Sequence, residues 1–425
     1  MAPWLHTAAG KQPDRAAIEG PERTLTYSEL SAAAIGAAGA LQRRGVQRGD
    51  RVALAVPSVE DFAVAMHGCL LAGAVAVPVD LRMTSEERAA RMAGAQVVLS
   101  EPPRPAPGGD VVGDDGDVAA VVMHTSGTTG AAKPVVLTRG NWMANALGSA
   151  VALGLNPAER WLCPMRLTHV GGLSIPIRSA VYATTAVVHG RFDTHAVLEE
   201  LMSPERRITL VSLVATMLSR LLDGGLSNPP TLRWALLGGG PIPAALLERA
   251  SAAGVPVAPS YGLTETCSQL ATFGWPLPGG EVRLAADGEV LAAGPMVSAG
   301  ALADDGWLHT GDLGCVDARG RLAITGRKAD TIVTGGENVA PVEVEDVLLA
   351  HPAVADAGVH GREDPEWGEA VVASVVPADG LTVSPEELRA HCAARLAGFK
   401  VPKRFEFVAA LPRTETGKLL RRELV

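Results

Sequence analysis

Short apolar runs alternate with amphipathic segments from residue 52 to residue 259, and this alternation constrains the fold more than any other feature. The apolar runs are rich in Val, Ala and Leu and carry few charges, as expected for strands buried on both faces. Helices between such strands cover both faces of a sheet, so the pattern predicts an α/β fold built on parallel-rich sheets. The predicted strands span residues 52–56, 75–79, 96–100, 118–123, 161–164, 186–189, 208–213, 232–237 and 255–259.

The segments between these strands have helical periodicity. Thr26 is followed three residues later by Glu29, which is the pattern of a capping box and predicts a helix that reaches Leu41. Further helices are predicted at residues 59–72, 85–92, 141–153, 173–182, 195–202, 216–222 and 243–253.

The pattern changes after about residue 270. Residues 274–325 are rich in turns and short strands and predict a small β-subdomain. From Arg327 onward, strands and helices follow in the mixed order of an α+β domain. Because 425 residues are too many for one comfortable core, we expect two domains, with a large N-terminal domain at 1–326 and a small C-terminal domain at 327–425.

Composition narrows the possible partners. The formal net charge is −9 and the chain has no Lys/Arg run, which argues against a nucleic-acid partner. The five cysteines lie far apart, which favours reduced thiols in a cytoplasm. The N-terminus lacks the regions of a signal peptide, and the most hydrophobic window, 63–79, is shorter than the roughly 20 residues of a membrane helix. We therefore expect a cytoplasmic protein without a membrane partner.

Residues 124–133, His-Thr-Ser-Gly-Thr-Thr-Gly-Ala-Ala-Lys, follow a predicted strand. Glycines let backbone N–H groups turn inward, hydroxyls add donors, and a lysine adds a point charge, so such a loop can hold phosphate. The spacing differs from that of the P-loop, and a lone cluster of this kind is more often a turn without a ligand. The candidate phosphate donors are Thr125, Ser126, Gly127, Thr128, Thr129 and Lys133.

Further polar clusters follow in order along the chain. Gly238, Gly239 and Gly240 end a predicted strand, where a flat ring can approach the backbone closely. Residues 260–266 offer an aromatic face at Tyr261 next to Gly262, a hydroxyl at Thr264, and a hard oxygen ligand for Mg²⁺ at Glu265.

Two charges near the predicted boundary could bind a sugar or a phosphate. Asp312 follows a tight turn and is suited to accept two ribose hydroxyls, and Arg327 offers a planar fork of donors. Taken singly, His169 before a Gly pair and Lys418 near the C-terminus are weak signals, because a lone His is more often structural and a tail Lys is usually solvated.

Together, these clusters resemble the motifs of the adenylate-forming superfamily, which includes acyl-CoA synthetases, carrier-protein adenylation domains and beetle luciferases. The resemblance spans roughly residues 25–421. It implies a large N-terminal domain, a small mobile C-terminal domain and a two-step reaction. A carboxylate first attacks the α-phosphorus of Mg-ATP to give an acyl-adenylate and pyrophosphate, and a thiol such as that of coenzyme A then attacks the mixed anhydride.

The resemblance implies a role for each matching residue. The loop donors named above, with Lys133, would hold the β,γ-phosphates of ATP. Gly238 to Gly240 and Tyr261 would frame adenine. Further roles would be the α-phosphate for Thr264, Mg²⁺ for Glu265, ribose for Asp312 and Arg327, the first catalytic step for Lys418, and the thioesterification loop for Gly335, Gly336 and Glu337.

A narrower resemblance lies in residues 167–179, Leu-Thr-His-Val-Gly-Gly-Leu-Ser-Ile-Pro-Ile-Arg-Ser. This segment is similar to one in the o-succinylbenzoate–CoA ligases of menaquinone biosynthesis and places His169 at the substrate as a binding and catalytic residue. The substrate carries a second carboxylate, for which Arg178, Ser212 and Ser260 are the candidate partners.

Two other functions stay open at this point. One is an aryl or acyl ligase of secondary metabolism that loads coenzyme A or a carrier protein. The other is a non-catalytic adenylate-binding protein, which the presence of the distant Lys418 disfavours. The chain also departs from the family pattern at Pro134, after the loop lysine, and at Ala329, where a hinge Asp or Lys is common.

Overall fold

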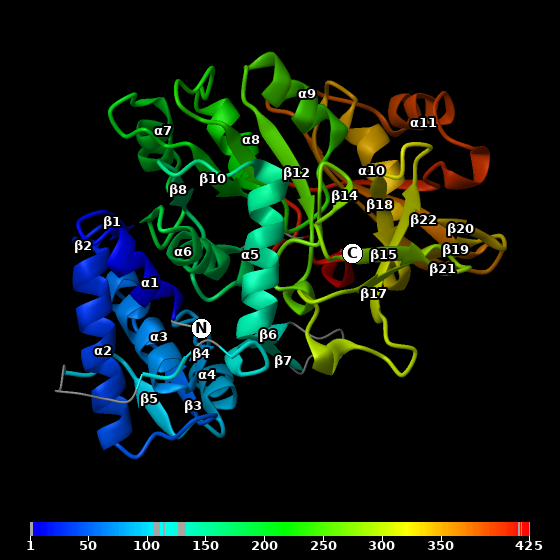
Figure 1. The fold of residues 1–425 in the computed structure, drawn as a ribbon. Coiled ribbons are helices and arrows are strands. Elements are labelled where there is room, and N and C mark those ends of the chain that lie inside the picture. The colour runs from blue at the N-terminus through cyan, green and yellow to red at the C-terminus, as the bar shows by residue number, and fades with distance from the viewer. Residues whose placement is uncertain are drawn as a thin grey trace.

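The computed structural model describes residues 3–104, 111–113, 115–125, 133–414, 417 and 419–424. Within these residues the chain forms four sheets with helices around them (Figure 1). Two large sheets make up the N-terminal part, a four-stranded sheet follows, and a five-stranded sheet lies near the C-terminus. The predicted class, α/β with a β-subdomain and an α+β C-terminal part, is confirmed.

The first large sheet has the strand order β5-β3-β4-β6-β7. Its first four strands are parallel to one another, whereas β7 runs antiparallel to β6. The capping box at Thr26 is present and begins α2, as predicted. The elements of this part are α2 (Tyr27–Arg43), β3 (Arg51–Leu54), α3 (Val59–Ala72), β4 (Val75–Pro78), α4 (Ser85–Met92), β5 (Val97–Leu99), β6 (Ala119–Thr125) and β7 (Lys133–Thr138).

The second large sheet has the order β14-β13-β12-β11-β10-β8-β9-β1-β2, with its parallel strands in the middle. Its strands are β1 (Ala16–Glu19), β2 (Thr24–Thr26), β8 (Arg160–Cys163), β9 (Thr185–Val188), β10 (Leu210–Leu213), β11 (Trp234–Leu237), β12 (Val257–Tyr261), β13 (Ala271–Thr272) and β14 (Trp275–Pro276). Its helices are α1 (Trp4–Lys11), α5 (Arg139–Leu153), α6 (Val170–Tyr182), α7 (Thr194–Met202), α8 (Ala215–Asp223) and α9 (Ala244–Ala252).

The structure corrects the prediction after the phosphate loop. The sequence suggested a strand, a loop and then a helix, but the residues from Lys133 onward form strand β7, which pairs with β6 before α5 begins. The run Pro134–Thr138 has the β-branched content of an edge strand, and a proline near its start is tolerated there. The N-terminal elements α1, β1 and β2 were also not predicted.

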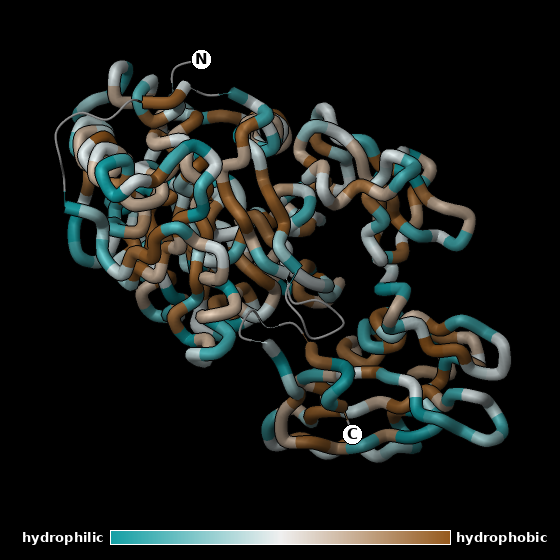
Figure 2. Tube along the Cα trace, turned by 90° about the horizontal axis from the view of Figure 1, so that it is seen from below, coloured by the Kyte–Doolittle hydropathy of each residue, from teal (hydrophilic) through white to brown (hydrophobic). Residues whose placement is uncertain are grey.

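The core follows from close helix and sheet packing. Small side chains on α2, including Ala34 and Ala37, are buried against α3. A Cβ on Gly68 would lie 2.7 Å from the Cβ of Ala37, so glycine at this position allows the two helices to approach closely. Strands β4, β9 and β10 are buried along their whole length. Figure 2, in which apolar residues are brown, shows apolar segments in the interior of the molecule.

The four-stranded sheet contains β15 (Glu281–Leu284), β16 (Glu289–Ala293), β17 (Leu308–Val316) and β18 (Leu322–Arg327). The short turn η3 (Lys328–Asp330) leads from it to the C-terminal sheet. That part consists of β19 (Ile332–Thr334), β20 (Glu337–Val339), α10 (Pro341–Leu349), β21 (Val354–Asp364), β22 (Gly368–Pro377), α11 (Pro385–Ala393) and β23 (Arg404–Phe407).

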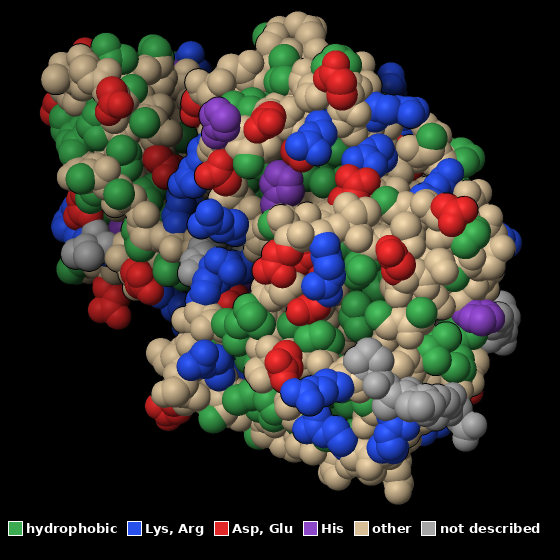
Figure 3. All heavy atoms as spheres, turned by 90° about the vertical axis from the view of Figure 1, so that its left-hand side faces the viewer, with side chains coloured by type: hydrophobic (Ala, Val, Ile, Leu, Met, Phe, Trp, Pro, Cys, Tyr) green, Lys and Arg blue, Asp and Glu red, His purple; other side chains and the backbone are tan. Residues whose placement is uncertain are grey.

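Charged side chains of both signs are interspersed on the face shown in Figure 3. Among the described residues, no helix is both long and apolar enough to span a lipid bilayer.

His67 on α3 makes stability depend on pH. Its ring is buried and its Nε2 has no hydrogen-bond partner, and burial lowers the pKa to about 4. The unfolded chain binds a proton near pH 6.5 and the folded chain does not, so acid favours unfolding. As the pH falls from above 6.5 to about 4, we expect this residue to cost roughly 3 kcal/mol of unfolding free energy.

Urea unfolding at pH 7.5 and pH 4.5 measures this loss. The variant His67→Leu should lose less stability than the wild type over the same interval. Equal losses in the two proteins would contradict the assignment.

Candidate active site

The glycine-rich end of β11 lies next to the end of β12 in the second sheet. Strands β11 and β12 are parallel neighbours, so Gly238, directly after β11, and Ser260, near the end of β12, lie at the same edge of the sheet. A Cβ on Gly238 would lie 2.6 Å from Ser260 Oγ, and Gly239 has a φ of +84°. Gly239 and Gly240 are exposed, and a Cβ on Gly240 would meet nothing within 4 Å, so a flat ring can reach the backbone of Gly238, Gly239 and Gly240, called the glycine slot below.

Asp312 joins the slot to the four-stranded sheet. The Tyr261 hydroxyl donates a hydrogen bond of 2.8 Å to Asp312 Oδ2, and Arg327 Nε lies 2.7 Å from Asp312 Oδ1. Burial, and then the Asp312 carboxylate, raises the pKa of Tyr261 well above its ordinary value, so the hydroxyl stays a donor. The structure therefore brings together three of the residues predicted at the nucleotide.

The hairpin of β6 and β7 carries the ends of the predicted phosphate loop. Thr125 pairs with Lys133 across this hairpin. Glu265 in the turn η1 (Thr264–Thr266) lies next to the same strands. Ser298 connects the two, because its N–H donates to the Glu265 carbonyl at 2.8 Å and its hydroxyl donates to the Val136 carbonyl at 2.8 Å. Ser126, Gly127, Thr128 and Thr129 lie outside the described residues.

The turn after Tyr261 is tightly folded. A Cβ on Gly262 would lie 1.6 Å from the carbonyl oxygen of Ser268, so only glycine fits at this position. Cys267 and Ser268 have φ values of +56° and +95°, a conformation that is unfavourable for side chains other than glycine. The backbone of this turn is thus held in a strained shape that presents Thr264 and Glu265.

Arg178 on α6 is a buried guanidinium with unused donors. Its Nη2 donates to Asn145 Oδ1 at 2.5 Å, and its guanidinium carbon lies 5.4 Å from the centre of the Trp161 ring. Its Nε and Nη1 are buried and have no hydrogen-bond partner. Burial lowers the pKa of Arg178. A buried charge is stable only when acceptors surround it, so these two nitrogens require a further acceptor.

Asn145 was not predicted, and it connects Arg178 to the nucleotide motif. Its Nδ2 donates to the carbonyls of Thr266 at 3.2 Å and Gln269 at 2.7 Å. A signal was available in the sequence, because Asn141 and Asn145 stand four residues apart on the same side of a mostly apolar helix. Polar residues at such buried positions usually have a specific partner.

The other two candidates for the second carboxylate differ in their position. Ser212 on β10 is buried, and its hydroxyl accepts the Trp161 Nε1–H at 2.9 Å, so it lies in the surroundings of Arg178. Ser260 instead donates to the Leu237 carbonyl at 3.2 Å. Strand β11 separates Ser212 from Ser260.

His169 precedes α6 and faces a charged cluster from the first sheet. The Asp80 carboxylate is bound by Arg82 through Nε at 2.9 Å, and it lies 3.5 Å from the Thr168 hydroxyl. Burial favours protonated Asp80, but the hydrogen bonds from Arg82 outweigh it and lower the pKa of Asp80 to about 2. Burial lowers the pKa of His169, which is therefore neutral at pH 7.

The tail reaches the N-terminal part of the molecule. Lys418 lies outside the described residues, but a Cβ on the preceding Gly417 would lie 2.4 Å from Thr216 Oγ1 on α8. Val214 lies two residues before Thr216, and a Cβ on Gly239 would lie 3.3 Å from Val214 Cγ1. The tail therefore contacts the helix that begins beside the glycine slot.

Gly335 and Gly336 form the turn between β19 and β20 and both have positive φ values, and Glu337 is the first residue of β20 and pairs with Thr334. The Gly335 N–H donates to the Trp367 carbonyl at 2.7 Å, which fixes this turn to the C-terminal sheet.

No group of three or more His, Cys, Asp or Glu side chains suited to a metal occurs within the described part of the chain. A single carboxylate at Glu265 fits Mg²⁺ nonetheless, because this ion is usually held by one or two carboxylates together with phosphate oxygens and water.

Replacing Gly262 by Ala should damage the turn. The added methyl group would overlap the Ser268 carbonyl, and we expect a loss of about 1–3 kcal/mol in unfolding free energy together with weaker nucleotide binding. Gly300→Ala is the matched control, because a Cβ there meets nothing within 4 Å. Chemical unfolding and AMP titration of both variants test this, and equal stability of the two would contradict it.

Comparisons with known proteins agree with this geometry. Residues 5–105 and 100–300 match the model of the AMP-binding enzyme family, and residues 343–418 match its C-terminal domain. A 2-succinylbenzoate–CoA ligase of Bacillus licheniformis is 38% identical in an alignment of 475 positions that covers 99% of this chain and 98% of the relative. A second such ligase, from Bacillus cereus strain Q1, is 36% identical, and its alignment covers 100% of this chain and 98% of the relative.

Solved structures show the same likeness. The o-succinylbenzoate CoA synthetase of Bacillus subtilis, in complex with the acyl-adenylate intermediate OSB-AMP, has a TM-score of 0.90 at 35% identity and matches over 100% of this chain and 98% of its own. Its complex with ATP and magnesium has a TM-score of 0.89 at 35% identity over 99% of this chain and 98% of its own. The resemblance predicted from the motifs is confirmed: the chain belongs to the AMP-binding enzyme family.

Proposed function

We propose that this protein is an AMP-forming acid–thiol ligase that converts o-succinylbenzoate to o-succinylbenzoyl-CoA for menaquinone biosynthesis. Its substrates are a small carboxylic acid, ATP and coenzyme A, and it uses Mg²⁺. One observation carries this assignment: Asn145 joins the buried Arg178, suited to a carboxylate, to the turn that bears Thr264 and Glu265.

The nucleotide roles follow from the chemistry of each side chain. Adenine would lie in the slot of Gly238, Gly239 and Gly240 beside Tyr261 and Gly262, and ribose would bind Asp312 and Arg327. Thr125, Lys133 and the loop between them would hold the β,γ-phosphates, with Thr264 at the α-phosphate. Mg²⁺ at Glu265 would neutralise phosphate charge. The binding residues would position the acid and the α-phosphate for in-line attack.

We further propose that residues 1–326 and 327–425 act as two domains. The contact between Gly417 and Thr216 supports a state in which Lys418 reaches the nucleotide site, as the first half-reaction requires. The turn at Gly335, Gly336 and Glu337 would face the site after the small domain rotates. The five cysteines are free thiols, four of them buried, which agrees with a cytoplasmic enzyme.

The acid would be oriented by its second carboxylate. Arg178 has two nitrogens, Nε and Nη1, without a hydrogen-bond partner, and a carboxylate or a water bound to it would accept from them. Ser212 is a second candidate, because its hydroxyl accepts a hydrogen bond from Trp161, which also contacts Arg178. Ser260 is the weaker candidate, because its hydroxyl already donates to the Leu237 carbonyl. Neutral His169, at the N-terminal end of α6, would form the opposite side of the acid site from Arg178.

The decisive experiment is ATP–pyrophosphate exchange with o-succinylbenzoate, benzoate and fatty acids, followed by trapping with coenzyme A. The proposal predicts exchange and thioester formation with o-succinylbenzoate. In Lys418→Ala, adenylation should slow about a hundredfold, because a positioned cation no longer stabilises developing charge. Transfer from synthetic acyl-adenylate to coenzyme A should be largely unchanged.

Other outcomes of these assays would change the assignment. Equal loss in both half-reactions of Lys418→Ala would remove the role given to this lysine. Exchange with other acids only, or transfer only to a phosphopantetheinyl carrier protein, would favour an aryl or acyl ligase of secondary metabolism. Protein that never splits ATP with any acid would be a binding protein.

Arg178→Met should raise the KM for o-succinylbenzoate by about tenfold or more, the cost of leaving a carboxylate without its charged partner. The KM for 4-oxo-4-phenylbutanoate, which lacks the ring carboxylate, should change much less. Arg178→Lys keeps the charge and is the control that separates loss of charge from a folding defect. Equal rises in KM for both acids in the two variants would contradict the role of Arg178.

A further inference from the structure

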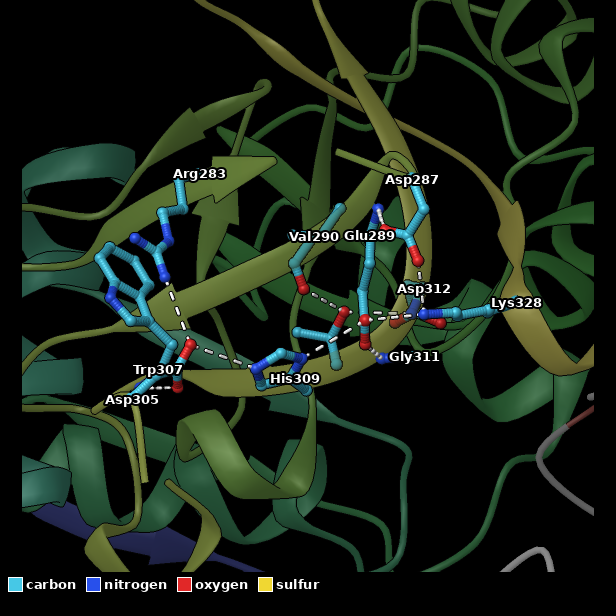
Figure 4. A network of polar contacts seen from close by, with 11 residues as sticks. Arg283, Asp287, Glu289, Val290, Asp305, Trp307, His309, Gly311, Asp312 and Lys328 are labelled. Atoms are coloured by element: carbon cyan, nitrogen blue, oxygen red, sulfur yellow. Dashed lines mark hydrogen bonds and ion pairs between the residues drawn. The ribbon is translucent and has the colours of Figure 1, made fainter. Parts of the chain in front are cut away.

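A buried carboxylate lies next to Asp312 and Arg327, the residues proposed to bind ribose. Glu289 on β16 has a side chain that is only 8% exposed (Figure 4). Its Oε1 accepts the N–H of Gly311 at 2.9 Å, and Gly311 immediately precedes Asp312. Its Oε2 lies 3.4 Å from His309 Nδ1 and 3.2 Å from Lys328 Nζ. Glu289 therefore contacts both strand β17, which carries Asp312, and Lys328, the first residue of η3 (Lys328–Asp330), called the hinge below.

Lys328 is held by two carboxylates at once. Besides Glu289, its Nζ lies 2.5 Å from Asp287 Oδ2, on the turn between β15 and β16. The two carboxylates raise the pKa of Lys328, and its ammonium lowers the pKa of Asp287. Burial of Glu289 works against ionisation, but the Gly311 N–H and Lys328 outweigh it and lower its pKa. All three groups are charged at neutral pH.

The other end of the hinge is tied to the C-terminal sheet. Asp330 Oδ2 lies 3.2 Å from Arg421 Nε. Arg421 also binds the Glu345 carboxylate through Nη2 at 2.9 Å and donates to the Val359 carbonyl at 2.8 Å. Of the three residues in η3, Lys328 is thus bound to the β-subdomain and Asp330 to the C-terminal part, while Ala329 between them has only a methyl group.

We propose that Asp287, Glu289 and Lys328 form a clamp that holds the N-terminal end of the hinge while the small domain rotates. Arg327 is bonded to Asp312 and directly precedes Lys328, so a rotation of the backbone at Lys328 would displace a ribose ligand. The clamp confines the rotation to residues after Lys328 and keeps Asp312 and Arg327 on the nucleotide. Its members are positioning residues, since none of them lies at the reacting atoms.

The consequence is retention of the intermediate. This inference rests on the proposed two-step reaction, in which the acyl-adenylate must stay bound during the rotation. With the clamp intact, each pyrophosphate released should be matched by one thioester. Without it, the ribose ligands move with the hinge, the acyl-adenylate escapes and is hydrolysed by water to acid and AMP, and pyrophosphate exceeds thioester.

The full-length variant Lys328→Met tests the clamp by two measurements. The Kd for AMP, measured by calorimetry, should rise about fivefold, as for the loss of one favourable ion pair. In reactions with o-succinylbenzoate, ATP and coenzyme A, the ratio of pyrophosphate to thioester should rise above one. Lys328→Arg keeps the charge and should restore both quantities to within about twofold of the wild type.

Arg321→Met is the matched control. It removes the same charge and an ion pair with Asp317, in which Arg321 Nε lies 2.7 Å from Asp317 Oδ2 in the turn between β17 and β18, but no described contact links that pair to the hinge. It should leave the Kd and the ratio unchanged. If Lys328→Met does not fold, Asp287→Asn removes half of the clamp at an exposed position and should change both quantities in the same direction.

Two results would overturn the clamp. One is a folded Lys328→Met (or Asp287→Asn in its place) with the Kd for AMP and the one-to-one ratio of the wild type. The other is Lys328→Arg as impaired as Lys328→Met. Failure of the proposed function looks different, because the wild type would then form no thioester from o-succinylbenzoate although AMP binding could still be compared between variants.

Discussion

The site depends on keeping one positive charge in a dry interior. Arg178 lies within α6, in contact with Asn145 of α5 and with Trp161, where an ion without acceptors would be very costly. Asn145 supplies one acceptor through Oδ1. Its Nδ2 donates to the carbonyls of Thr266 and Gln269, so the same side chain fixes both Arg178 and the turn that contains Thr266. The position of the guanidinium and the shape of the nucleotide turn are therefore set together. An acid bound at Arg178 would have its reactive end directed by the same hydrogen bonds that present Glu265.

A second arrangement of charges governs the boundary between the two parts of the chain. Asp312 is held by Tyr261 and Arg327, and the buried Glu289 supports the preceding Gly311. These contacts lie within the four-stranded sheet or join it to the second large sheet through Tyr261, whereas Asp330 and Arg421 belong to the C-terminal side. In the proposed two-step reaction, the first set of contacts would stay in place and the second would move with the small domain. Ala329, which departs from the usual hinge residue of the family, stands between the two sets of contacts.

Local chemistry made most of the fold predictable. Buried strands such as β3 and β4 have no polar face, so their apolar runs stand out in the sequence, and the capping box at Thr26 marks the start of α2. Strand β7 was missed because it directly follows a polar loop and begins with a lysine and a proline. Its strand conformation comes from pairing with β6, a partner that periodicity within the segment itself does not reveal.

The sequence by itself determined the family, the order of the nucleotide motifs and the presence of a separate C-terminal part, because each depends on residue types at short spacing. Tertiary structure alone decided which distant residues meet. Asn145 with Arg178, Ser298 between Val136 and Glu265, and Lys328 with Glu289 are contacts between elements far apart in the chain. Such pairs arise from the packing of sheets and helices and from the need to satisfy buried charges, and neither leaves a periodic trace in the sequence.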